Sequence, residues 1–95
     1  MTVCDLAIAN QLGLHARAAA KFVHTAGRFA SKIRVARGGR EVDGKSIMGL
    51  LLLAASRGSA IRLTADGPDE RDAIAALCAL VERGFDETSA PRGDS

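Results

Sequence analysis

The sequence predicts an α+β fold, an open-faced sandwich in which a four-stranded antiparallel sheet carries three helices on one face. Segments with strand-like alternation and segments with helical spacing of apolar residues follow one another in the order β-α-β-β-α-β-α. The Gly38-Gly39 pair lies between two strand-like segments and favours a tight hairpin, because glycine accepts positive φ angles. The other connections are long enough to cross one face of the sheet, which places the helices together.

The alternating pattern predicts four strands, over residues 3–9, 33–37, 40–43 and 60–65. In the first strand Cys4, Leu6 and Ile8 share one face, which we expect to point inward. Cys78 lies on the apolar stripe of the last helix, so both cysteines are predicted to be reduced thiols that pack as small apolar side chains.

The helical spacing predicts three helices. The first runs from Ala16 to about Gly27. The second starts after the N-cap Ser46 and continues to about Ser56. The third opens at Gly67-Pro68-Asp69-Glu70, with proline and acidic residues in its first turn, and ends near Arg83. We expect one domain over residues 1–86, followed by a disordered polar tail over 87–95.

Composition excludes several classes of function. The net charge is only +2, and no basic stripe is interleaved with aromatic residues, which argues against nucleic-acid binding. The longest apolar run, over 47–55, is too short to cross a membrane, and the N-terminus lacks the features of a signal peptide. Two distant cysteines form no metal-binding pattern, so we expect no metal and no cofactor. These features predict a cytoplasmic protein.

The segment Gly13-Leu14-His15-Ala16-Arg17 is the strongest candidate for a chemical site. No usual N-cap residue precedes His15, so the first N–H groups of the helix are expected to lack a partner in the chain. A helix N-terminus binds phosphate, and Arg17 adds charge-assisted hydrogen bonds. These residues predict a histidine that carries a phosphoryl group. The alternative is a surface histidine that serves as a loose helix cap. His24, in mid-helix, is predicted to face solvent.

Two segments together resemble the HPr family, the histidine-containing phosphocarriers of the bacterial phosphotransferase system. They are the His15 segment with the Ala-rich helix and Lys21-Phe22-Val23 that follow it, and Gly44-Lys45-Ser46-Ile47-Met48-Gly49-Leu50. The resemblance covers residues 1 to 86. It implies that His15 takes a phosphoryl group on Nδ1 from enzyme I and passes it to an IIA-type protein, while Arg17 steadies the group. Such a protein is a stoichiometric carrier and not an enzyme.

The same resemblance implies that HPr kinase/phosphorylase phosphorylates Ser46. Beside Ser46, the side chains of Ile47, Met48 and Leu51 are one turn apart and predict an exposed apolar patch, which with Ala20 is expected to bind a partner. Two other interpretations of Ser46 are a simple N-cap and a purely regulatory binding module that acts through Ser46 and its apolar neighbours. Ala18 stands where the family commonly has proline. The form with alanine, Gly-Leu-His-Ala-Arg-Ala, resembles the nitrogen-type, regulatory versions of the family. We expect a monomer.

Residues 39–46 match the nucleotide-binding pattern G-x-x-x-x-G-K-[ST] letter for letter. Their context disagrees, because residues 40–43 are predicted to be a strand that returns from the hairpin. Glu41 and Asp43 would also place negative charge beside phosphates. We therefore predict no nucleotide binding at this segment.

Overall fold

The computed structural model describes residues 1–86 and has the predicted fold class. All neighbouring strands of its four-stranded sheet are antiparallel, in the spatial order β1-β4-β2-β3. The predicted tail over 87–95 lies outside the described residues. The elements are β1 (Thr2–Ala7), α1 (Ala16–Ala26), β2 (Lys32–Arg37), β3 (Arg40–Asp43), α2 (Ile47–Leu52), β4 (Ala60–Asp66) and α3 (Glu70–Glu82).

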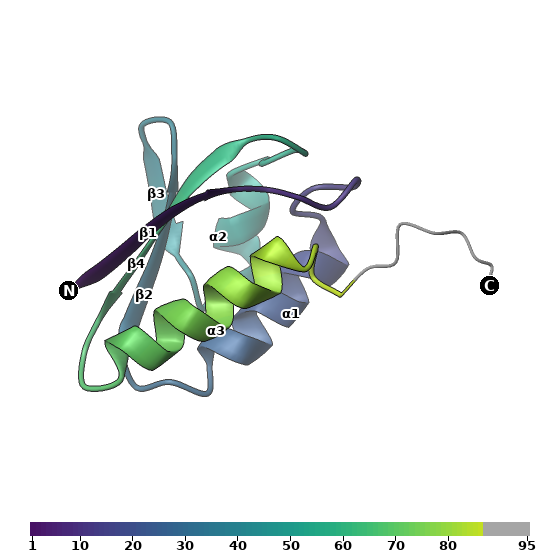
Figure 1. The fold of residues 1–95 in the computed structure, drawn as a ribbon. Coiled ribbons are helices and arrows are strands. Elements are labelled where there is room, and N and C mark those ends of the chain that lie inside the picture. The colour runs from purple at the N-terminus through teal and green to yellow at the C-terminus, as the bar shows by residue number, and fades with distance from the viewer. Residues whose placement is uncertain (87–95) are drawn as a thin grey trace.

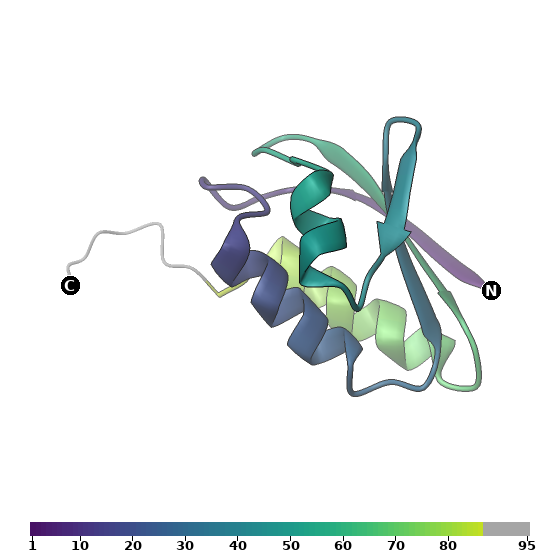
Figure 2. The ribbon, with the colours of Figure 1, turned by 180° about the vertical axis from the view of Figure 1, so that it is seen from behind.

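The three helices cover the same face of the sheet, as opposite views show (Figures 1 and 2). Ile33 and Leu63 project from the strands into the layer between sheet and helices, where Phe22 of α1 and Leu77 of α3 meet them. Burial of these apolar side chains is the main favourable term in folding. The sheet and the two long helices therefore form one rigid frame behind the loops at their ends.

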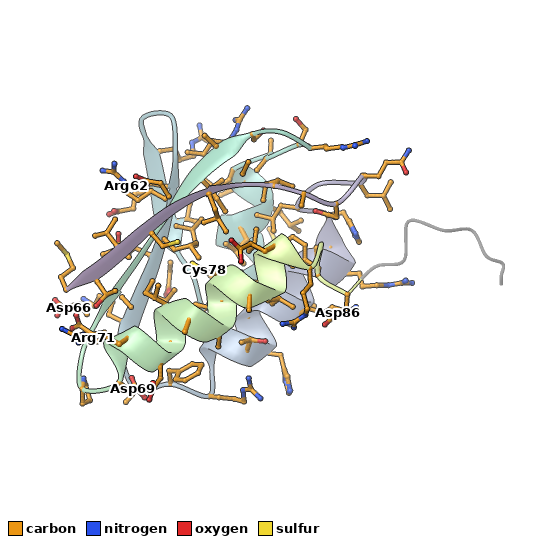
Figure 3. All side chains as sticks on the ribbon, in the orientation of Figure 1. Arg62, Asp66, Asp69, Arg71, Cys78 and Asp86 are labelled. Atoms are coloured by element: carbon orange, nitrogen blue, oxygen red, sulfur yellow. The ribbon has the colours of Figure 1, made fainter. Side chains whose placement is uncertain are left out.

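The two cysteines lie against this core. Cys4 of β1 and Cys78 of α3 are free thiols, both partly buried, as their positions on apolar faces predict. Burial, together with a hydrogen bond to the Cys4 thiol, raises the pKa of Cys78 to about 12. Figure 3 shows Cys78 on α3. Cys78 therefore remains a neutral thiol at physiological pH, consistent with a packing role.

Helix α2 is shorter than predicted, since it ends at Leu52 and not near Ser56. Ala54 adopts a left-handed conformation, with φ of 51°, which breaks the helical path. The last carbonyls of α2 also find partners outside the helix. Arg37 donates to the Leu53 carbonyl at 3.1 Å, and Arg40 donates to the Leu52 carbonyl at 3.0 Å. The hairpin thus caps α2 through tertiary contacts that local spacing does not reveal.

Helix α3 begins one residue after Asp69, so Pro68 precedes the helix and does not lie within its first turn. The Asp69 carboxylate is used elsewhere. It accepts hydrogen bonds from the Ala30 N–H at 2.9 Å and from the Ser31 N–H at 3.0 Å, which fastens the α1–β2 loop to the start of α3. A hydrogen bond from the Ser31 hydroxyl, together with these two backbone bonds, lowers the pKa of Asp69.

Glu70 is expected to contribute to the acid sensitivity of the fold. Hydrogen bonds from the Thr2 hydroxyl, the N-terminal amino group and the Gly67 N–H lower the pKa of Glu70 to about 2. Between pH 4.5 and 2 the unfolded chain binds more protons at this carboxyl than the folded chain does. The free energy of unfolding should therefore fall as the pH drops through this range.

We expect Glu70→Gln to reduce the fall in the free energy of unfolding between pH 4.5 and 2, measured by urea unfolding at several pH values. Glu41→Gln, at an exposed residue of β3, is the matched control. An equal fall in the free energy of unfolding with pH in the wild type and in Glu70→Gln would contradict the prediction.

Candidate functional site

His15 occupies the N-cap position of α1, at the end of the β1–α1 loop. Its backbone is extended, and its Nδ1 atom accepts a hydrogen bond from the Arg17 N–H at 3.2 Å. The first N–H groups of α1 were expected to lack a partner in the chain. That expectation is wrong for the Arg17 N–H, because it donates to the imidazole of His15. The alternative interpretation, a helix cap, describes this contact. An accepting Nδ1 carries a lone pair, so the nitrogen that faces the helix end is also the nucleophilic one.

Hydrogen bonds hold the loop that carries His15. The side-chain amide of Asn10 donates to the Gly13 carbonyl at 2.7 Å, and the Gly13 N–H donates to the Asn10 carbonyl at 3.2 Å. The Leu14 N–H donates to the Ala55 carbonyl at 2.8 Å. Gly13 has φ of 70°, and a Cβ atom there would lie 2.6 Å from that same carbonyl oxygen. The glycine thus lets two loops touch directly behind His15.

A hollow opens beside His15, between the β1–α1 loop, the α2–β4 loop and the turn after α3. Lys21 donates to the Phe85 carbonyl at 2.8 Å, and Arg83 pairs with Asp86 at 2.7 Å. Within residues 1–86, Arg17 and Arg57 form no ion pair. The charged side chains of the lining are Arg17, Lys21, Arg57, Arg83, Glu82 and Asp86.

The turn after α3 forms one wall of this hollow. The Gly84 N–H donates to the Val81 carbonyl and the Phe85 N–H to the Leu80 carbonyl, both at 2.9 Å, with Gly84 at φ of 68°. This is a Schellman motif, in which a left-handed residue satisfies the last carbonyls of a helix. Phe85 is fully buried and its carbonyl accepts from Lys21, so the end of α3 is tied to α1 near His15.

Ser46 is the N-cap of α2, as predicted. Its hydroxyl oxygen accepts a hydrogen bond from the Gly49 N–H at 3.0 Å. The Asp43 carboxylate accepts from the Lys45 N–H at 2.9 Å, which fixes the turn before the helix. Ser46 is partly exposed and has exposed residues on both sides, Lys45 and Ile47.

The predicted partner surface is largely exposed. Met48 is 70% exposed and Ile47 41%, and Ala20 is exposed on the neighbouring α1. Leu51 differs from the expectation, because it is partly buried against the core. Leu52 and Leu12 are further exposed apolar side chains, at 60% and 72%, and neither was predicted. Figure 2 shows α2 packed beside α1.

The remaining positions on α1 agree with expectation. Ala18 is fully buried in the first turn, and the helix forms from Ala16 without the proline that the resemblance leads one to expect. Alanine has the highest helix propensity, which accounts for the intact helix start. His24 is exposed, as predicted for a solvent-facing residue.

Residues 39–46 do not form a phosphate-binding loop. Residues 40–43 are strand β3, and a Cβ atom at Gly44 would lie 2.5 Å from the Ile33 side chain. The Gly44 N–H donates to the Ile33 carbonyl and the Ser46 N–H to the Asp43 carbonyl. The N–H groups of Gly44 and Ser46 are therefore used within the fold, and the strand at 40–43 replaces the glycine-rich cradle that phosphate binding requires.

Residues 1–86 contain no cluster of three or more histidine, cysteine or acidic residues arranged to hold a metal ion. None of the helices found there has the length and apolar content needed to cross a membrane.

Comparison with known proteins gives consistent results. Residues 3–83 match the family model described as "PTS HPr component phosphorylation site". The chain is 53% identical to the phosphocarrier protein HPr of Cupriavidus necator, over 87% of this chain and 93% of that protein. It is 42% identical to the phosphocarrier protein NPr of Shewanella violacea, over 90% and 93%. The crystal structure of an HPr from Thermoanaerobacter tengcongensis is similar, with TM-score 0.89 and 45% identity, covering 93% of this chain and 99% of that one.

Proposed function

Since this chain belongs to the HPr family of the phosphotransferase system, we propose that it accepts a phosphoryl group on His15 from phospho-enzyme I and passes it to an IIA-type protein. The observation that carries the proposal is the contact between Nδ1 of His15 and the Arg17 N–H. It aims a nucleophilic nitrogen at a helix N-terminus, which attracts negative charge. We place the transfer in the cytoplasm and expect a monomeric carrier.

The transfer itself is an exchange of phosphorus–nitrogen bonds. The lone pair of Nδ1 attacks the phosphorus of a phosphohistidine on the donor, and the bond from phosphorus to the donor nitrogen breaks as the new one forms. The lone pair that accepted the Arg17 N–H is then used in the new bond. The phosphoryl oxygens take over as acceptors for this N–H group, and the Arg17 guanidinium adds charge-assisted hydrogen bonds.

The direct test is to incubate the full chain with enzyme I and phosphoenolpyruvate and to follow its mass and the stability of the label. We expect one added phosphoryl group per chain, labile in acid and stable in base, which then moves to an IIA-type protein. Failure to acquire the group, with binding to the partners retained, would favour the purely regulatory module instead.

Ser46 is proposed as a second phosphorylation site, modified by HPr kinase/phosphorylase. A phosphate at a helix N-terminus is compatible with the fold, because free N–H groups and the helix dipole favour the charge. The exposed side chains of Ile47 and Met48 lie directly after Ser46, so a dianion there would weaken docking of an acidic partner.

The pathway served, sugar uptake or nitrogen-type regulation, follows from the IIA partner and not from these residues.

We expect Ser46→Asp to slow phosphorylation of His15 by enzyme I several-fold while the thermal midpoint changes little. Aspartate keeps the cap on the Gly49 N–H and adds a negative charge. Ser46→Asn is the matched control, because asparagine keeps the cap without the charge. Equal slowing by both variants would show that Ser46 acts through structure alone. Initial rates at subsaturating enzyme I, together with melting curves, distinguish an effect of the negative charge from an effect on the structure.

A further inference from the structure

Arg57 is a basic residue of the hollow beside His15 that the proposed transfer does not use. It lies in the α2–β4 loop, outside every helix and strand. Both ribbon views place this loop beside the β1–α1 loop that carries His15 (Figures 1 and 2). Arg57 and His15 line the same hollow, although they are far apart in the sequence.

The loop around Arg57 is held in a fixed place. The Gly58 N–H donates to the Ile8 carbonyl and the Ile8 N–H donates to the Ser59 carbonyl, both at 2.9 Å. The Ser56 N–H donates to the Ser59 hydroxyl at 3.0 Å. Just before Arg57, the Ala55 carbonyl accepts from Leu14 in the loop that holds His15. The backbone of Arg57 is therefore positioned relative to His15 by hydrogen bonds on both of its sides.

The charges around the hollow single out Arg57. Asp86 is paired with Arg83, and Lys21 donates to the Phe85 carbonyl, so these cations already have protein partners. Arg17 is assigned to the phosphoryl group. Within residues 1–86 the exposed Arg57 has no ion pair, which leaves a second guanidinium available in the lining of the hollow. A guanidinium suits bidentate recognition of a carboxylate.

We propose that Arg57 is a docking residue that binds a carboxylate on the face of the phosphoryl donor protein and so orients that protein on His15. This inference rests on the proposed function, which brings the phosphoryl donor protein to His15 and therefore to the hollow that Arg57 lines. The role belongs to association and not to the chemical step. Charges at the rim of an interface mainly change the association rate and the dependence of binding on salt.

The test compares Arg57→Gln with Arg57→Lys in phosphorylation by enzyme I. At low salt we expect Arg57→Gln to raise the KM for the carrier about three- to fivefold, with kcat unchanged. The difference should shrink at about 0.5 M salt, where charges are screened over a few ångströms. Arg57→Lys should recover part of the loss. Unchanged thermal midpoints would exclude a structural effect.

Arg71→Gln is the matched control, because it removes the same charge at the far end of α3 from Asp86 (Figure 3). An equal rise in KM in Arg71→Gln would overturn the proposal, since net charge would then explain the effect. An unchanged KM in Arg57→Gln, or a fall in kcat alone, would also overturn it.

A second measurement separates this inference from the proposed function. The affinity of the unphosphorylated carrier for enzyme I, measured by titration calorimetry, needs no transfer. If the wild type never acquires a phosphoryl group, the proposed function fails, while the affinities of wild type and Arg57→Gln still judge Arg57. Equal affinities at low salt would overturn the docking role.

Discussion

His15→Asn is expected to abolish phosphorylation by enzyme I while leaving the fold intact. An amide has no nucleophilic nitrogen comparable with the Nδ1 of a neutral imidazole, so the transfer loses its acceptor. Asparagine is among the best N-cap residues, and its carbonyl oxygen can accept the N–H that His15 accepts from Arg17. The free energy of unfolding should therefore change by less than about 1 kcal/mol. Mass spectrometry after incubation with enzyme I and phosphoenolpyruvate should detect no added phosphoryl group.

The second histidine supplies the control for this experiment. His24 lies on the same helix, exposed and away from the helix start. We expect His24→Asn to be phosphorylated at the rate of the wild type. A label that persists in His15→Asn and disappears in His24→Asn would move the carrier site to His24. Loss of the label in both would point to damaged docking instead of a missing acceptor.

The elements of this fold follow from local patterns, because each depends on the periodicity of its own residues. Alternation placed Cys4 and Ile8 inward, and helical spacing placed Phe22 in the core. The boundaries that differ depend on distant residues. Helix α2 ends early because Ala54 turns left-handed and because Arg37 and Arg40 reach its carbonyls from the hairpin. No local pattern within 47–56 contains that information.

The candidate site likewise contains residues that local sequence patterns identify and residues whose place depends on tertiary packing. His15 and Arg17 stand out in the sequence because they are neighbours at a helix start. Phe85 gave only a weak signal, a glycine followed by an aromatic residue after a helix, which is compatible with a Schellman motif. Arg57 gave none, because its place beside His15 depends on the packing of one loop on another. The nucleotide-binding pattern over 39–46 shows the converse: a complete sequence match forms no phosphate-binding loop here, because residues 40–43 are a strand and the next N–H groups bond within the fold.

Gly13→Ala is expected to lower the free energy of unfolding by about 2–4 kcal/mol and to slow phosphorylation of His15. Two separate effects add at this residue. An alanine at φ of 70° is strained, and its Cβ would lie 2.6 Å from the Ala55 carbonyl oxygen, so the two loops must separate. The Ala55 carbonyl accepts from Leu14, whose neighbour is His15, so separation also displaces the acceptor ring.

Two hairpin glycines separate these effects. Gly38 has φ of 62° with nothing within 4 Å of a Cβ atom, so Gly38→Ala should show the backbone strain alone, about 1 kcal/mol. Gly39 has open space and no positive φ, so Gly39→Ala should change stability little. Urea unfolding of the three variants gives the effect of loop contact as the difference between Gly13→Ala and Gly38→Ala. If that difference is zero, the loops give way at no cost, and the position of His15 does not depend on their contact. A difference above about 1 kcal/mol, with slower phosphorylation only in Gly13→Ala, would show that the α2–β4 loop holds His15 in place for transfer.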